Sequence, residues 1–138
     1  MADTAHMVTD QKPVELILAR GLMSNLTTPA FLVDLEGTLV FFNDAASEVL
    51  GLRYEDAGPL ELQEWGTRFL PVTDDGRSIS IDDLPLTRAL RDGRPGHLRF
   101  RIRSATGEER DIEVSAFPIV GNAGMRGAMA IFWAAKDG

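Results

Sequence analysis

The chain has 138 residues, no cysteine and a formal net charge of −7. This length is typical of one domain, and the lack of cysteine excludes disulfides, thiolate nucleophiles and cysteine-ligated metals. The acidic balance argues against a nucleic-acid-binding domain, which usually carries a basic stripe. No apolar run is long enough to span a membrane, and the N-terminus lacks the pattern of a signal peptide. We therefore expect a cytoplasmic protein.

The first 26 residues divide into a polar segment and an apolar helix. Residues 1–12 show no pattern and are expected to be disordered. Over residues 13–26 the apolar side chains cover more than half of a helix circumference, which is wider than one packed surface needs. The helix either covers its own sheet alone or also packs against a second subunit. We favour a homodimer, whose expected interface is Val14, Ile17, Leu18, Leu22, Met129, Ile131 and Trp133.

Two short strands, 30–35 and 38–43, are predicted on either side of an E-G turn. Asn43 or Asp44 then caps a short helix that Gly51 ends. For Asn43 we favour the structural role of a cap, and contact with a ligand is the alternative.

The segment 52–72 is predicted to hold one or two short helices. Trp65 and Phe69 lie four residues apart, so they can share one helix face. They are either core residues or part of a cavity wall. The buried candidates of the segment are Leu60, Leu62, Trp65, Phe69 and Leu70.

Residues 73–81 read as a turn followed by a short extended piece. Asp82 or Asp83 is predicted to cap the next helix, with Pro85 in its first turn and Gly93 at its end. The inner stripe of this helix is Leu86, Ala89 and Leu90.

Residues 97–118 are predicted to form an antiparallel hairpin, because apolar residues alternate with charged ones in two runs that flank T-G-E. If Thr106, Gly107 and Glu108 form the loop, the facing pairs are Ile102 with Ile112, Phe100 with Val114, Arg103 with Asp111 and Arg101 with Glu113. A shift by one residue would bring Ile102 opposite Asp111, so the apolar pattern and the charge pairing favour the same register.

A turn over residues 121–124 leads into a last strand, 126–135, whose two faces are both apolar. A strand of this kind is typical of the centre of a sheet that is covered on both sides. The order of elements therefore predicts an α+β domain: a five-stranded antiparallel sheet with short helices on one face and the N-terminal helix on the other.

The sequence resembles a PAS domain over residues 25–134. The resemblance rests on three blocks: NLTTPAFLVDLEGTLVFFNDAASEVLG (25–51), DGRSISIDDLPLTRALRDG (75–93) and GEERDIEVSAFPI (107–119). The last two are similar to the PAS subgroup common in bacterial signalling proteins. The expected domains are a disordered segment 1–12, a capping and dimerisation helix 13–26, and the PAS domain 27–135.

The resemblance implies a sensory or protein-interaction module, attached to a kinase, a phosphatase or a transcription regulator. It also implies dimerisation through the N-terminal helix and a small, mainly apolar ligand between the sheet and the helices. The residues expected to contact such a ligand are Phe42, Asn43, Trp65, Phe69, Leu86, Leu90, Phe100, Val114, Ala116 and Phe132.

The sequence departs from the resembled family in three ways. Its flavin-adduct members need a cysteine, which is absent here. Its haem members use a His on the helix that corresponds to residues 83–92, which has none, and His97 is in phase with the outward arginines. We therefore expect no flavin adduct, no haem and no other cofactor. The last strand continues into F-W-A-A-K-D-G instead of the usual D-[IV]-T, which leaves open how a signal would pass to an output domain.

No residue pair in the sequence suits catalysis, because neither His lies beside a Ser or Asp partner. The D-D pairs at 74–75 and 82–83 are explained by turns and caps. The row Arg99, Arg101 and Arg103 reads as a solvated face, or as a docking surface for an acidic partner.

Three functions remain: a sensory PAS module, a ligand-free dimerisation or docking module, and a small isomerase-like enzyme, which would need an inward carboxylate or His. A cavity under roughly 100 Å³ would exclude ligand sensing, since drug-sized ligands need about 300 Å³ or more.

Overall fold

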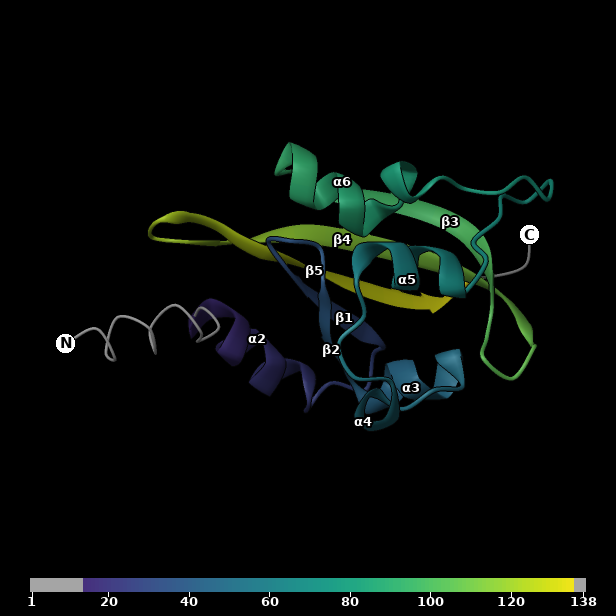
Figure 1. Ribbon diagram of the computed structural model, residues 1–138, viewed down its shortest axis with the longest axis horizontal. Helices are drawn as coiled ribbons and strands as arrows, with labels where there is room; N and C mark the ends of the chain where they lie inside the picture. The colour runs from purple at the N-terminus through teal and green to yellow at the C-terminus, as the bar shows by residue number, and fades with distance from the viewer. Residues whose placement is uncertain (1–13, 136–138) are drawn as a thin grey trace.

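The computed structural model describes residues 14–135, so the expected disordered segment lies outside the described residues. Figure 1 shows a central sheet with α5 and α6 on one side and α2 on the other. In chain order the elements are α2 (Val14–Met23), β1 (Ala30–Asp34), β2 (Leu39–Phe42), α3 (Asp44–Leu50), α4 (Tyr54–Ala57), α5 (Leu62–Arg68), the 3-10 helix η1 (Ile81–Asp83), α6 (Pro85–Asp92), β3 (Gly96–Arg103), β4 (Glu109–Gly121) and β5 (Gly124–Ala134).

The five strands form one antiparallel sheet in the order β2-β1-β5-β4-β3. This confirms the predicted α+β architecture. The last strand, β5, lies at the centre, where both of its faces are covered. Its alternation sends Ala128, Ala130 and Phe132 to the side of α5 and α6, and Met129 to the side of α2.

The larger of the two cores lies between the sheet and the helices α3, α5 and α6. It joins inward residues of all five strands to Leu50, Trp65 and Leu86, which are at most 6% exposed. Burial of this many aromatic and aliphatic side chains stabilises the fold mainly through the hydrophobic effect.

The smaller core lies under α2. Leu16 and Met23 are seven residues apart, so they share one helix face, and they are only 2% and 0% exposed against β1, β2 and β5. The helix ends at Met23, three residues before the predicted end. Its inward face is narrow, and most of its other apolar residues are left outside.

The predicted cap at Asn43 is confirmed. Its side-chain Oδ1 accepts a hydrogen bond from the Ala46 N–H at the start of α3, and Gly51 ends the helix in the left-handed conformation. Oδ1 also accepts from Ala30 N–H, while Nδ2 donates to the carbonyls of Met23 and Thr28. This one buried side chain therefore ties together α2, β1 and α3.

Two local predictions are wrong. Leu70 is 58% exposed rather than buried, because the chain reverses after α5 with Leu70 at φ 49°, which turns its side chain outward. Asp82 and Asp83 do not cap α6. They belong to η1, whose first turn is capped by Ser80, and α6 begins at Pro85 without a side-chain cap.

The hairpin of β3 and β4 forms as predicted, but in a register shifted by two residues. Phe100 faces Ile112 and Arg101 faces Asp111, where Val114 and Glu113 were expected. A shift by two keeps every side chain on its predicted face, so the alternating pattern cannot distinguish the two registers. The turn determines the register, because Gly107 adopts φ 92° and its N–H bonds to the Ser104 carbonyl. Ser104 thus starts the loop.

Candidate functional site

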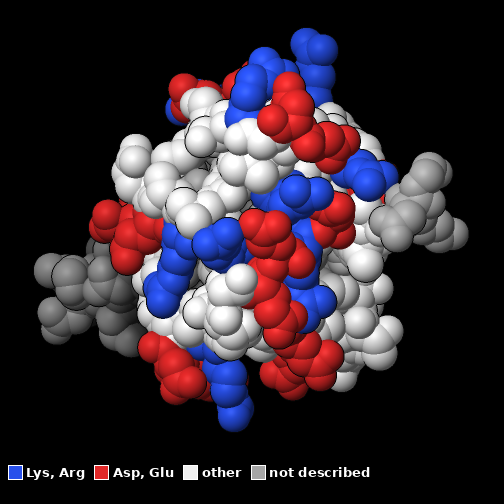
Figure 2. Space-filling view, turned by 90° about the vertical axis from the view of Figure 1, so that its right-hand side faces the viewer, with Lys and Arg blue, Asp and Glu red and all other residues white. Residues whose placement is uncertain are grey.

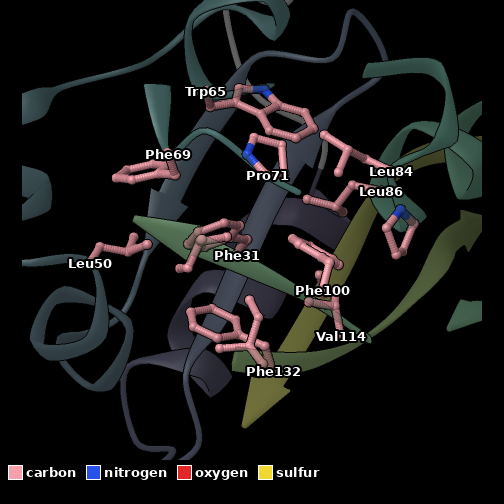
Figure 3. A pocket seen from close by; sticks show the side chains of 14 residues that line it. Phe31, Leu50, Trp65, Phe69, Pro71, Leu84, Leu86, Phe100, Val114 and Phe132 are labelled. Atoms are coloured by element: carbon pink, nitrogen blue, oxygen red, sulfur yellow. The ribbon is translucent and has the colours of Figure 1, made fainter. Parts of the chain in front are cut away.

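The candidate ligand site is a cavity between the sheet and α5 and α6, with a volume of about 60 Å³. Figure 3 shows side chains from the sheet and from the helical segments converging on it. The fourteen residues around it are Phe31, Leu50, Trp65, Phe69, Pro71, Leu84, Pro85, Leu86, Phe100, Ile102, Ile112, Val114, Ala130 and Phe132.

Two aromatic arrangements fix the shape of this cavity. The Trp65 indole N–H donates to the Gly37 carbonyl at 2.8 Å, so its one polar atom is satisfied at the β1–β2 turn. Phe31 packs edge-on against Phe132 with the ring centroids 5.1 Å apart. Large rings thus occupy most of the space between the layers, and little volume is left.

The chemistry of the cavity is uniform. Every lining side chain is apolar apart from the hydrogen-bonded indole N–H, so the wall offers no acid, base or nucleophile. A guest would find no hydrogen-bonding side chain to orient it. The volume is also below the roughly 100 Å³ under which ligand sensing is excluded, and far below the roughly 300 Å³ of a drug-sized ligand pocket.

Six of the ten residues expected to contact a ligand line the cavity: Trp65, Phe69, Leu86, Phe100, Val114 and Phe132. The other four do not. Phe42 is buried behind Phe31, which it meets edge-on, and Asn43 uses both ends of its amide for backbone groups. Ala116 belongs to the core beside the cavity, and Leu90 is only partly buried against it.

Eight lining residues were not predicted as ligand contacts: Phe31, Leu50, Pro71, Leu84, Pro85, Ile102, Ile112 and Ala130. The alternating pattern of the hairpin places Ile102 and Ile112 on its apolar face, but it does not give their position along the sheet. Alternation in β1 would have placed Phe31 beside Val33 on the same face. Pro71 and Leu84 lie outside any periodic element, and no sequence signal marks them.

A second candidate site is the outward face of α2, which we call the α2 stripe: Val14, Ile17, Leu18 and Leu22. These side chains are 60%, 57%, 67% and 61% exposed. The three β5 residues that were predicted to join them in the interface are less exposed. Met129 is only 7% exposed beneath α2, Ile131 is partly buried, and Trp133 is 38% exposed. Met129 is thus covered by its own chain.

The outer face of the β3–β4 hairpin carries paired charges. Arg101 and Arg103 bond to Asp111 and Glu109 at 2.7 Å and 2.9 Å. The hydrogen bond from Arg101 holds the pKa of Asp111 below its usual value, and Asp111 in turn raises the pKa of Arg101. In Figure 2 basic and acidic side chains lie side by side on the face shown. The arginine row is paired within the chain.

No helix among residues 14–135 is long and apolar enough to cross a membrane. Within the same part of the chain, no cluster of three His, Asp or Glu side chains is arranged to hold a metal ion.

The comparisons with known proteins concern the fold. The family model described as "PAS fold" matches residues 18–58. The PAS domain of BvgS from Bordetella pertussis is similar with a TM-score of 0.61 and 18% identity, over 89% of this chain and 87% of that one. The Rhodobacter sphaeroides LOV protein gives a TM-score of 0.68 and 16% identity, over 90% of this chain and 69% of that chain.

A third similar structure is the PAS domain of nitrogen regulation protein NR(II) from Vibrio parahaemolyticus, with a TM-score of 0.60 and 15% identity, over 86% of this chain and 98% of that chain. No curated protein sequence matches the chain. At these identities the structural similarity establishes the fold.

Proposed function

Because the chain has the fold of PAS domains and its residues 18–58 match the PAS fold model, we propose that it is a non-catalytic dimerisation module of a bacterial signalling protein. Two copies associate through the α2 stripe, and the module links that association to an effector such as a kinase, a phosphatase or a transcription regulator. The observation that carries this proposal is the contrast between the two faces of α2.

The inner and outer faces of α2 are both apolar, but only one is covered. Leu16 and Met23 seal the sheet, while Ile17 and Leu18 are more than half exposed. Monomeric proteins rarely leave a contiguous apolar patch of this kind in water, and such patches mark interaction sites. Burying the stripe would remove four large side chains from water, at a gain of roughly 25 cal/mol per Å².

A second copy of the chain is the occupant that fits this stripe. Val14, Ile17, Leu18 and Leu22 follow the i, i+3, i+4, i+8 spacing with which helices pack against one another. Gly21 falls in the same row, and a Cβ there would meet nothing within 4 Å, so a partner helix can approach closely. A two-fold axis places the same stripe on both sides, which makes the contact self-complementary.

The cavity supports the ligand-free form of this function over the sensory form. A volume of about 60 Å³ does not accommodate a drug-sized ligand, and the wall has no free polar side chain to orient a smaller one. Native mass spectrometry of the purified protein tests this point. A stoichiometric bound molecule, retained under gentle ionisation, would restore the sensory function.

The non-catalytic part of the proposal rests on the same wall. An isomerase-like enzyme needs a carboxylate or His facing the cavity, and none lines it. The effector class is supported by similar structures that include a PAS domain from a two-component sensor histidine kinase.

The dimer is tested by size-exclusion chromatography with light scattering. We expect the full chain to elute as a dimer and the double variant Ile17→Glu/Leu18→Glu to elute as a folded monomer, because charges in the stripe would be buried on association. Leu70→Glu is the matched control, since Leu70 is 58% exposed but lies at the end of α5. A wild-type monomer up to millimolar concentration, or a dimer that survives the double substitution, would contradict the proposal.

A further inference from the structure

A second, polar groove of about 580 Å³ lies beside β3 and adjoins the apolar cavity at Pro85. One wall is formed by the turn segment 73–80 and another by α6, and the floor is the first half of β3. None of the functions discussed above uses this groove.

The floor of the groove is an open sheet edge. β3 is the last strand of the sheet, and β4 pairs with only one of its sides. On the other side Val72 bonds to Arg101 through both backbone groups, and the Arg103 N–H bonds to the Phe69 carbonyl. Every second residue of an antiparallel strand directs its backbone N–H and carbonyl to the same edge. The backbone groups of His97, four residues before Arg101, therefore also point to the outer edge. No described strand pairs with this edge at His97.

The reason for the opening is the course of the chain after Val72. A continuing strand would run past Arg99 and His97, but the chain turns back at Thr73, whose N–H bonds to the Arg77 carbonyl. The returning segment pairs Ser78 with Val72 instead. The turn thus leaves the groove open along the first half of β3, between residues 73–80 and the loop before β3.

The charges around the groove favour an acidic occupant. Its lining contains four arginines, at 77, 88, 94 and 99, and two carboxylates, Asp83 and Asp92, and Asp74 on the adjoining turn pairs with Arg99 at 3.9 Å. Arg77 and Arg88 pair with Asp75 and Asp83, yet all four side chains are more than half exposed, and pairs of this kind contribute at most about 1 kcal/mol. Arg94 makes no ion pair with any described residue and is exposed.

We propose that this groove binds an extended acidic segment of a partner protein, which adds to the edge of β3 as a sixth strand. The backbone of the segment pairs with that of His97, and its carboxylates contact Arg94 and Arg88. The backbone N–H and carbonyl of His97 can be satisfied by another strand, whereas a compact anion reaches only the arginines. Both features of the groove therefore point to a peptide rather than to a small anion.

The test is a titration of the full chain, labelled with ¹⁵N, with four capped pentapeptides. The probes are Glu-Val-Glu-Val-Glu, Lys-Val-Lys-Val-Lys and the acidic peptide N-methylated at alternate residues, in both possible frames. We expect the acidic peptide to shift the His97 amide resonance and slow its hydrogen exchange, the basic peptide to have no effect, and at least one N-methylated frame to bind at least about tenfold more weakly.

Variants at Arg94 separate the groove from non-specific attraction. Arg94→Glu should weaken binding of the acidic peptide at least about tenfold and Arg94→Gln by less, because charge reversal adds repulsion to the loss of attraction. Arg53→Glu is the control, since Arg53 is 72% exposed and lies at the start of α4. It should change the affinity by less than about twofold.

Three results would overturn the proposal. One is the absence of any shift at His97 up to millimolar acidic peptide. Another is binding of both N-methylated frames as tightly as the unmodified acidic peptide, which would mean that no strand forms. The third is binding of citrate or inorganic phosphate to the same residues as tightly as the peptide, which would assign the groove to a small anion. The oligomeric state of the protein does not affect any of these outcomes.

Discussion

Arg101 and Asp111 face each other across the β3–β4 hairpin, with the guanidinium Nε 2.7 Å from the carboxylate Oδ1. This pair defines the actual register of the hairpin, since the alternative predicted from the pattern would pair Arg101 with Glu113. It also has the clearest electrostatic signature in the described part of the chain, because the two groups shift each other's pKa in opposite directions.

The pair predicts a pH effect on stability. The pKa of Asp111 is lowered in the folded state by the hydrogen bond from Arg101, so its contribution is complete above the unfolded pKa of about 4 and is lost as the pH falls through the folded pKa. The measurement is a ¹³C-carboxyl NMR titration of Asp111. We expect Arg101→Gln to raise its midpoint toward the ordinary aspartate value.

Arg103→Gln is the matched control for this titration. It breaks the neighbouring ion pair with Glu109 but removes no group that shifts the pKa of Asp111, so the midpoint should hardly move. A wild-type midpoint at or above the ordinary value would show that the Arg101 pair does not form in solution.

Asn43→Ala should be among the most destabilising single changes to a polar residue. Asn43 is 2% exposed, and its amide makes four hydrogen bonds to backbone groups of α2, β1, α3 and the intervening loop. Loss of the amide leaves buried backbone groups unpaired, and we expect a decrease of about 3 kcal/mol in the free energy of unfolding. Urea denaturation followed by circular dichroism measures it.

The neighbouring substitution Asp44→Ala tests whether the effect belongs to the buried network. Asp44 is exposed in the first turn of α3, so its loss removes only a favourable interaction with the helix dipole, worth under about 1 kcal/mol. Equal costs for the two substitutions would mean that Asn43 acts only as an ordinary cap.

Gly127→Ala should disrupt the junction between β1 and β5. A Cβ at Gly127 would collide with the Val33 backbone carbonyl and come within 3.0 Å of Leu16 Cδ2 on α2. A backbone atom cannot move aside cheaply, so we expect a loss of at least about 2 kcal/mol, again from urea denaturation.

Gly96→Ala in β3 provides the comparison. Its Cβ would meet Pro85 only at 3.9 Å, which is an ordinary contact, and alanine loses less backbone entropy on folding than glycine does. We expect unchanged or slightly higher stability. If Gly127→Ala were equally harmless, the distance between Gly127 and the Val33 carbonyl would have to be larger than in this structure.

The fold was largely predictable because periodicity reports which face a residue occupies. Ala130 and Phe132 alternate with Met129 in the sequence, and the structure assigns them to opposite cores. The same signal found six of the cavity-lining residues. It missed Pro71 and Leu84, which reach the cavity from irregular segments whose position depends on contacts distant in sequence.

The sequence by itself determined which face of each strand is apolar, that a short helix follows the second strand and ends at Gly51, and that β5 is covered on both sides, because these depend on local spacing and capping. Only the tertiary structure decided the register of the hairpin, since a shift by two preserves both faces and the choice falls to the turn at Gly107. It also decided that large rings leave a cavity of about 60 Å³, because the volume between two layers depends on how side chains from separate elements interlock. The open edge at His97 likewise follows from where a distant segment turns away.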